Sequence, residues 1–298
     1  MKIIKLPYLL TLAVLVLINT PLSSQESELE LTYLGAAGWK VVTNEVTILI
    51  DPYITRKNYS QRRDSIAVSD TDLIDKHIKE ADYILVHHGH PDHLMDVPYI
   101  AKKTGAKVIG TETTMNILKA YDIDRDNLYT VKGGEDYQFE SFSVRVIPSL
   151  HSPLSQKRYF DSSRYTEPLA QPVKYSDMKE GGSLMFLLRI NDTEILTMGS
   201  MNFIEREIQG LSPNVLLAGS ANSRLNIYKY TERLLSLTNY PGIVIPTHWD
   251  NFSVPYDDKE AQQQARKAKV DPFVNEVKEL SPDIRVIIPE HLKSIKIK

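Results

Sequence analysis

Four of the chain's eight histidines lie in one stretch of seven residues, 87–93, which reads HHGHPDH. The stretch restricts the fold because it directly follows a compact apolar run, residues 83–86, whose length predicts a buried strand. A loop at the end of a buried strand is a rigid place from which several side chains can converge, and Pro91 stiffens this one. The sequence therefore predicts a strand that presents imidazoles and a carboxylate to one site.

The chain contains no cysteine, so any metal site must use histidine and carboxylate ligands. His88, His90, Asp92 and His93 have the spacing His-x-His-x-Asp-His. The ordinary alternative is a polar turn whose histidines contact water or backbone, and a single histidine would favour it. Four potential ligands at fixed spacing rarely coincide by composition alone, so the pattern favours a metal site.

Apolar runs and amphipathic segments alternate on both sides of the histidine stretch. Strands followed by helices occur twice over, which predicts two sheets with helices on the outside. No repeat or interdomain linker interrupts the pattern, so we expect one domain. The predicted strands are 29–34, 40–43, 46–50, 83–87, 107–110, 128–131, 142–147, 183–190, 194–198, 214–218, 242–246 and 285–288. The predicted helices are 72–80, 95–104, 112–120, 204–209, 228–237 and 259–279.

The N-terminal segment has the pattern of a secretory signal peptide. Lys2 and Lys5 provide a positive start, residues 6–18 are mostly apolar, and small residues follow. We expect a signal peptide over residues 1–24 and a domain over 25–298 that is exported to the periplasm or the extracellular space. The alternative is an uncleaved anchor, but the apolar run is shorter than the roughly 20 residues that span a bilayer. No stable membrane span is therefore expected after cleavage.

Residues 152–182 interrupt the alternation and form a predicted loop insertion. The segment is polar, contains three prolines and ends in two glycines. Loops of about 30 residues within a compact domain are uncommon and are often functional. We expect either a lid over the site or a plain surface insertion. Its tyrosines and basic residues suit a small polar or anionic substrate, whereas the net charge of −3 argues against a nucleic-acid partner.

Residues 88–93 resemble the His-x-His-x-Asp-His signature of the metallo-β-lactamase superfamily. Residues 48–53, ILIDPY, are similar to the family's strand that ends in Asp-Pro, and His151 and His248 occupy the positions of its later metal histidines. The resemblance extends over most of residues 30–290 and implies an α/β fold, a four-layer αββα sandwich. The Pro-x-His pattern that ends at His248 resembles the branch that contains ascorbate-6-phosphate lactonase and the phospholipase D that acts on N-acyl ethanolamine lipids.

The resemblance also implies a ligand set for two metal ions. The implied ligands of the first ion are His88, His90 and His151, and those of the second are Asp92, His93 and His248. Asp51 would accept a hydrogen bond from a ligand imidazole and fix its tautomer, the alternative being a turn cap. The implied cofactor is zinc, as one or two ions. Asp92 is the catalytic candidate, because its carboxylate can orient the nucleophile or accept its proton.

One position departs from the family pattern. The family has an aspartate that bridges both metals after a strand running into glycine, and Ser200 stands in that place. A neutral hydroxyl is a poor substitute for a bridging carboxylate, so we expect the second ion to bind weakly or to be absent. Asp250, two residues after His248, is an alternative carboxylate for that ion. Three histidines are expected outside the site: His87 in the core, and His77 and His291 at the surface.

Together these features predict a secreted, zinc-dependent hydrolase that uses metal-bound hydroxide. Zinc lowers the pKa of bound water from about 15.7 to about 7, which gives a nucleophile at neutral pH. The expected substrate is a small ester, lactone, amide or phosphodiester, and the sequence defines no oligomeric state. Two alternatives stay open: a phosphodiesterase or phospholipase D-like enzyme of the same fold, and a metal-retaining protein without turnover. Ser200 motivates the second alternative.

Overall fold

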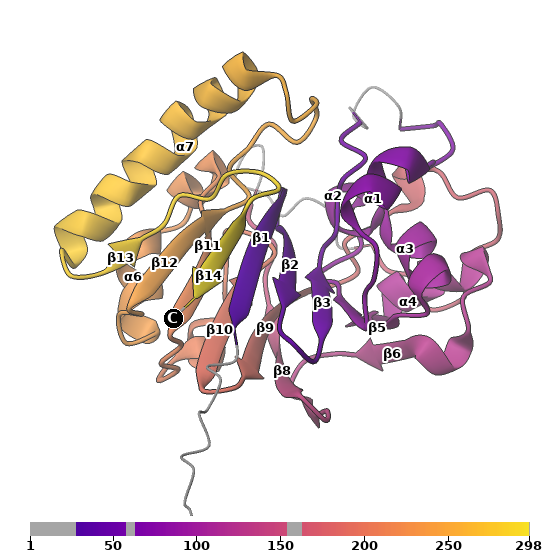
Figure 1. The fold of residues 1–298 in the computed structure, drawn as a ribbon, viewed down its shortest axis with the longest axis horizontal. Coiled ribbons are helices and arrows are strands. Elements are labelled where there is room, and N and C mark those ends of the chain that lie inside the picture. The colour runs from indigo at the N-terminus through magenta and orange to yellow at the C-terminus, as the bar shows by residue number, and fades with distance from the viewer. Residues whose placement is uncertain (1–27, 58–62, 154–162, 298) are drawn as a thin grey trace, which may run out of the picture.

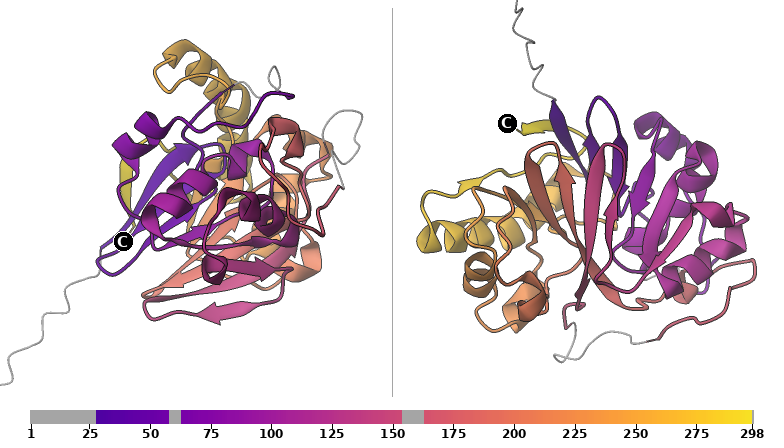
Figure 2. Two further views of the ribbon diagram at one scale, coloured as in Figure 1. Left: turned by 90° about the vertical axis from the view of Figure 1, so that its right-hand side faces the viewer. Right: turned by 90° about the horizontal axis from the view of Figure 1, so that it is seen from below.

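The computed structural model describes residues 28–57, 63–153 and 163–297 of the 298-residue chain. Within these residues two seven-stranded sheets pack against each other, and helices cover the outer face of each sheet (Figures 1 and 2). The layers are thus helices, sheet, sheet and helices, which confirms the predicted αββα sandwich. The predicted signal peptide, residues 1–24, lies outside the described residues.

Each sheet combines a parallel and an antiparallel half. In spatial order the first sheet contains β14 (Ser294–Ile297), β1 (Leu29–Gly35), β2 (Gly38–Val42), β3 (Thr47–Ile50), β4 (Tyr83–Leu85), β5 (Lys107–Thr111) and β6 (Leu128–Val131). The second contains β13 (Arg285–Val286), β12 (Ile243–Thr247), β11 (Val215–Gly219), β10 (Thr193–Met198), β9 (Ser183–Ile190), β8 (Phe142–Ser149) and β7 (Asp136–Gln138). Strands β3 to β6 and β10 to β13 pair in parallel, and the other neighbours are antiparallel.

The helices divide between the two outer faces (Figure 1). The first sheet carries α1 (Thr71–His77), α2 (Pro91–Leu94), α3 (Val97–Thr104) and α4 (Glu112–Leu118), and the second carries α5 (Glu205–Ile208), α6 (Tyr230–Leu237) and α7 (Lys259–Leu280). Short 3₁₀ helices are η2 (Lys119–Tyr121), η3 (Arg125–Asn127), η5 (Tyr175–Asp177) and η6 (Asn222–Asn226). Among the described residues, no helix combines the length and the apolar character that a membrane span requires.

Local side-chain chemistry sets where several helices begin and end. Asp70, Thr111 and Asp258 precede α1, α4 and α7, and each side-chain oxygen accepts a hydrogen bond from a backbone N–H of the first turn. Pro91 opens α2, where a missing N–H costs nothing. Gly105 ends α3 in the left-handed conformation that glycine adopts without strain.

Three apolar clusters hold the layers together. The central cluster lies between the sheets and includes Trp39 of β2 and Phe186 of β9. A second cluster fills the space under α1, α3 and α4, where Ile100 is fully buried. A third lies under α6 and α7 and includes Leu234 and Phe273. Strand β9 is buried along nearly its whole length because both of its faces are covered, as in other doubly covered sheets.

Each predicted strand and helix appears in the structure, and the differences lie in short elements. The sequence did not predict α2, β7 or β14, which are formed by a single turn or by pairing at a sheet edge. The described part of the predicted loop insertion, residues 163–182, packs onto the helices of the first sheet. The backbone N–H of Leu169 donates to the carbonyl of Asn116 (3.0 Å), and Tyr175 is buried. The N–H of Gly89 donates to the carbonyl of Glu180 (3.0 Å), so this segment also supports the histidine loop.

Candidate metal centre

Loops at the carboxyl ends of five strands converge on one edge of the sandwich. Asp51 follows β3, residues 87–93 follow β4, and His151, Ser200 and His248 follow β8, β10 and β12. All of these named side chains are buried. The carboxyl ends of the strands are where α/β sheets present ligand-binding side chains, and the fold therefore explains why distant residues meet here.

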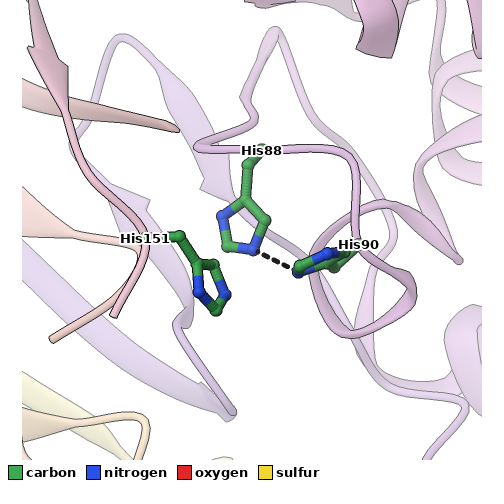
Figure 3. A group of neighbouring side chains, drawn as sticks. All are labelled: His88, His90 and His151. Atoms are coloured by element: carbon green, nitrogen blue, oxygen red, sulfur yellow. Dashed lines mark hydrogen bonds between the residues drawn. The ribbon is translucent and has the colours of Figure 1, made fainter. Parts of the chain in front are cut away.

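The first donor group consists of His88, His90 and His151, whose ligand atoms lie within 4.8 Å of one another (Figure 3). Nε2 of His88 and Nδ1 of His90 are 3.0 Å apart. The His151 ring lies 5.0 Å from each of the other two rings, measured between centroids. Nδ1 of His151 lies 2.8 Å from the Ser152 carbonyl, to which it can only donate, so Nε2 is left with a free lone pair.

Burial keeps two histidines of the first donor group, His88 and His151, uncharged. It holds the pKa of His88 well below the usual range, and the nearby rings of His93, His90 and His151 add to the effect. Burial also lowers the pKa of His151 to about 4. Neutral imidazole is the form that coordinates metals, so these side chains are ready to bind an ion at neutral pH.

The second donor group consists of Asp92, His93 and His248, and it is charged. One carboxylate oxygen of Asp92 lies 3.2 Å from Nε2 of His93 and 3.2 Å from Nε2 of His248. Burial opposes a charge on His93, but the carboxylates of Asp92 and Asp51 outweigh it and raise the pKa of His93 to about 10. The pKa of Asp92 is held well below its usual range, because His93 and His248 outweigh the effect of burial.

Asp51 lies behind the second donor group and contacts two imidazoles. Its carboxylate accepts from Nδ1 of His93 (2.5 Å), which is the contact predicted for it. It also accepts from Nδ1 and the backbone N–H of His87, at 2.6 and 2.8 Å. Burial opposes its charge, but both imidazoles outweigh this and lower the pKa of Asp51 to about 2. Its contact with His93 turns Nε2 of that ring towards Asp92.

His87 is buried as predicted, but the sequence did not predict its polar contacts. Nε2 of His87 lies 2.7 Å from the hydroxyl of Thr197, and the ring packs against Phe186. A signal for the Asp51 contact was present, because Asp51 and the His87 loop directly follow neighbouring parallel strands in which Ile50 pairs with Leu85. Asp51, His87 and His93 thus form a hydrogen-bonded anchor behind the site.

Ser200 supports the loop that carries His151. Its hydroxyl oxygen accepts from the backbone N–H of Ser152 (2.9 Å) and contacts the Ser152 hydroxyl (3.2 Å). The side-chain amide of Asn202 donates to the carbonyl of His151 (3.2 Å). Ser200 therefore holds the backbone next to His151 through neutral hydrogen bonds and adds no charge there.

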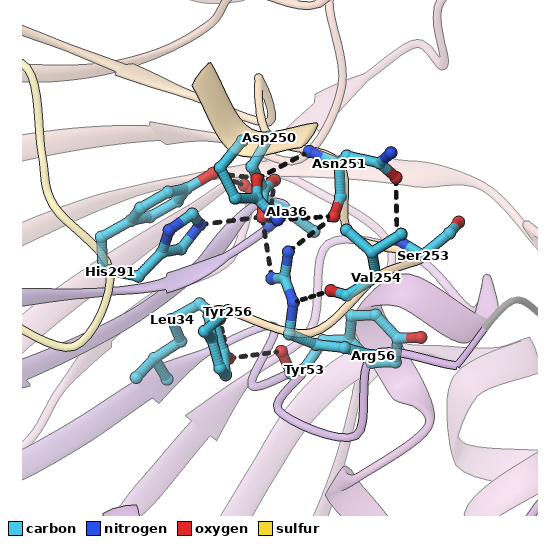
Figure 4. Close-up of polar contacts among 12 residues, drawn as sticks. Leu34, Ala36, Tyr53, Arg56, Asp250, Asn251, Ser253, Val254, Tyr256 and His291 are labelled. Carbon is cyan, nitrogen blue, oxygen red and sulfur yellow. Dashed lines mark hydrogen bonds and ion pairs between the residues drawn. The ribbon is translucent and has the colours of Figure 1, made fainter. Parts of the chain in front are cut away.

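The idea that Asp250 replaces the missing carboxylate is wrong, because other groups occupy both of its oxygens (Figure 4). One oxygen accepts from Arg56 (2.8 Å) and contacts His291 (2.9 Å). The other accepts from the Tyr33 hydroxyl (3.1 Å) and the Ala36 N–H (2.9 Å). The surface position predicted for His291 is also wrong, since its side chain is 11% exposed and stacks on Tyr33. No sequence pattern linked these residues.

The donor set fits a divalent cation such as zinc, which prefers nitrogen and carboxylate oxygen ligands when thiolates are absent. Nε2 of His88 and Nδ1 of His90 face each other at 3.0 Å, close enough for one cation to accept a lone pair from each ring. The shared oxygen of Asp92 gives the second group a negative ligand.

Comparison with known proteins identifies the family. The family model for the β-lactamase superfamily domain matches residues 30–248, which is most of the chain. The chain belongs to the metallo-β-lactamase superfamily. The related proteins are named metal-dependent hydrolases, the activity that the sequence predicts.

Two relatives and one solved structure illustrate the match. A UPF0173 metal-dependent hydrolase from Carboxydothermus hydrogenoformans is 33% identical over 41% of this chain and 48% of its own length. A UPF0173 metal-dependent hydrolase from Methanosarcina mazei is 27% identical over 82% of this chain and 94% of its own length. Igni18, a metallo hydrolase from Ignicoccus hospitalis, is 19% identical with a TM-score of 0.59 and supports the fold, covering 91% of this chain and 99% of its own. The match to the first relative thus spans about half of that protein.

Proposed function

We propose that this superfamily member is a zinc-dependent hydrolase of small esters, lactones, amides or phosphodiesters. The observation that supports the proposal is the presence of two donor groups side by side at one strand edge. The rings of His88 and His93, one from each group, lie 3.8 Å apart between centroids. Adjacent sites of this kind can hold a metal, a water and a substrate oxygen together.

Each donor group contributes differently to the proposed reaction. His88, His90 and His151 would hold the first ion and leave a coordination position open. When bound, such an ion lowers the pKa of water and polarises a carbonyl or phosphoryl oxygen. Asp92 is ionised at neutral pH because its pKa is low, so its carboxylate accepts a hydrogen bond and orients the attacking water. A carboxylate with so low a pKa is a weak proton acceptor.

Substrate branch, export and partners complete the proposal. The Pro-x-His pattern at the end of β12, which places His248, supports the lactonase-like branch. The charge and hydropathy pattern of residues 1–24 supports export to the periplasm or the extracellular space. The net charge of −3 supports a small molecule, rather than a nucleic acid, as the binding partner.

The test compares the wild-type protein with His88→Ala and His151→Ala on a panel of esters, lactones, amides and bis-p-nitrophenyl phosphate. Zinc per chain is measured on the same samples. We expect both variants to lose bound zinc and hydrolysis together, because each removes one of three ligands. Activity on the phosphodiester with none on lactones would select the phosphodiesterase alternative within the same fold.

The matched control is His77→Ala, since His77 lies in α1 outside both donor groups. It should keep the zinc content and the activity of the wild type. Unchanged hydrolysis in His88→Ala and His151→Ala would contradict the proposed function, whatever their zinc content. Zinc binding without turnover on any substrate would instead support the metal-retaining binding protein that Ser200 suggests.

A further inference from the structure

Ala36, Arg56 and His248 have left-handed backbone conformations at the second donor group, as does Asp51, which contacts His93. The φ angles of Ala36, Arg56 and His248 are 47°, 49° and 55°, a region that residues other than glycine rarely adopt. They belong to three different loops, after β1, β3 and β12. Such strained conformations persist only where the surrounding structure fixes them, and they concentrate at functional sites.

Hydrogen bonds connect the three strained residues through one carboxylate. The backbone N–H of His248 donates to the carbonyl of Ala36 (2.7 Å), and the N–H of Ala36 donates to Asp250 (2.9 Å). Nη1 of Arg56 donates to the other oxygen of Asp250 at 2.8 Å (Figure 4). The Tyr33 hydroxyl lies 2.9 Å from the Ala36 carbonyl and 3.1 Å from Asp250, so its one proton is shared between two acceptors that belong to this turn and to the carboxylate. The pose of His248 is therefore tied to the Arg56–Asp250 pair.

Arg56 directs its remaining donors at the segment that follows His248. Nη2 donates to the carbonyl of Asn251 (2.7 Å), and Nε donates to the carbonyl of Val254 (2.8 Å). The side chains of Arg56 and Asp250 are 1% and 0% exposed. A buried ion pair adds little net stability over apolar residues of the same volume, because both charges lose their hydration. Stability alone therefore does not account for a buried arginine that clamps this one loop.

We propose that Arg56 and Asp250 are positioning residues that hold the His248 imidazole towards Asp92. This inference rests on the proposed function of the second donor group. The pair fixes the turn of residues 248–250 against the Ala36 turn, so that Nε2 of His248 stays 3.2 Å from the Asp92 carboxylate. Phe252 packs edge-on against the His248 ring and limits its rotation from the other side.

A purely structural role predicts something different. The Asp250 carboxylate also contacts His291, which leads into β14, so the pair also connects the C-terminal segment to the core. If that were its only role, substitution would lower stability and leave metal binding unchanged. A measurement of zinc binding or of the His248 ring position therefore distinguishes the two roles, whereas a measurement of stability does not.

The first experiment measures zinc affinity by chelator competition in the wild type and in Arg56→Met. We expect the dissociation constant of the second zinc to rise about tenfold to a hundredfold, as is typical when a residue that orients a ligand is lost. The constant of the first zinc should change by less than about twofold, because that group lies on other loops. Arg56→Lys keeps the charge but not the several donors of the guanidinium. Its dissociation constant for the second zinc should lie between those of the wild type and Arg56→Met.

Two controls make the result specific. Arg224→Met removes another buried arginine, paired with Glu276 at 2.8 Å in a different part of the fold, and should leave both zinc constants unchanged. In a His248→Ala background, Arg56→Met should have no further effect on the second zinc, because the residue through which it acts is gone. An equal loss in that background would overturn the inference.

Crystal structures of the metal-free wild type and Arg56→Met decide the question independently of zinc. We expect the His248 ring to move away from Asp92 in the variant, and an unmoved ring would overturn the inference. Arg56→Lys takes the place of Arg56→Met in this comparison if the methionine variant does not fold. A wild type that binds no zinc would contradict the proposed function, while these structures would still test the positioning role.

Discussion

The two donor groups come largely from one loop, yet they differ in charge. In the first group, burial holds the pKa of His88 well below its usual range and lowers that of His151 to about 4. In the second, Asp92 and Asp51 overcome the effect of burial and raise the pKa of His93 to about 10. One group is thus ready for a cation, whereas the other already contains its own ion pair.

This difference suggests an order of metal binding. An ion that enters the first group displaces no proton from His88 or His151, but an ion that enters the second must displace one from His93. The position to which the resemblance assigns a bridging carboxylate holds Ser200, whose neutral hydroxyl accepts from the Ser152 N–H. The first site should therefore fill before the second, and the following experiments test that difference.

The largest effect should come from removing one ligand of each group. His90→Ala should abolish binding of the first zinc. It should reduce hydrolysis by more than about a hundredfold, the upper loss typical of removing a residue that only orients a ligand. His248→Ala should weaken only the second zinc and retain part of the activity. Zinc titration and steady-state kinetics on the same samples measure both. Equal losses in the two variants would show that the groups act as one unit.

The next effect is a contrast in pH dependence. Because His93 is protonated at neutral pH and must lose that proton to coordinate, the affinity for the second zinc should rise about tenfold per pH unit between pH 6 and 8. His151 is already neutral there, so the affinity for the first zinc should stay nearly flat. Calorimetry in buffers of different ionisation enthalpy should detect about one proton released by the second ion. Release of a similar proton by the first ion would contradict the comparison.

Restoring a carboxylate should reduce the difference between the sites. Ser200→Asp puts a carboxylate at the position where the resemblance implies one that bridges both ions, so the dissociation constant of the second zinc should fall about tenfold or more. Ser200→Asn is the matched control, with a similar volume and no charge. A wild type without turnover that becomes active only in Ser200→Asp would identify a site that has lost its catalytic function. No change in either variant would mean that Ser200 does not set the second affinity.

The sequence was sufficient for the parts of the fold that depend on local patterns. The strand at 183–190 was predicted with its observed bounds, because its largely apolar residues end at the turn signal Asn191-Asp192. Helix α2 and strand β14 were not predicted. The first is a single turn that begins at Pro91, and the second is a short edge strand that forms by pairing with β1. Neither has enough residues to show a period.

The residues of the candidate site could likewise be predicted only where a local sequence pattern pointed to them. Residues 88–93 could be found because their spacing is local, and His151 and His248 because each follows a strand. The contact of Arg56 with Asp250 spans 194 positions, and no pattern in either segment points to the other. Sequence reasoning assigned Asp250 to a metal because it is close to His248 along the chain. The structure shows that the backbone turn at His248 directs the two side chains to different partners.

The smallest effect is expected at the anchor behind the second group. Thr197→Val removes the hydroxyl that contacts Nε2 of His87 and leaves that buried nitrogen without this partner. We expect a loss of about 1–3 kcal/mol in the free energy of unfolding, with zinc affinities within about twofold of the wild type. Thr197→Ser keeps the hydroxyl and should recover most of the stability. Chemical denaturation and zinc titration measure the two quantities. If Thr197→Val instead strongly weakened binding of the second zinc, the hydrogen-bonded residues behind the site would also set its affinity. The effect would then pass from Thr197 of β10 through His87 and Asp51 to His93.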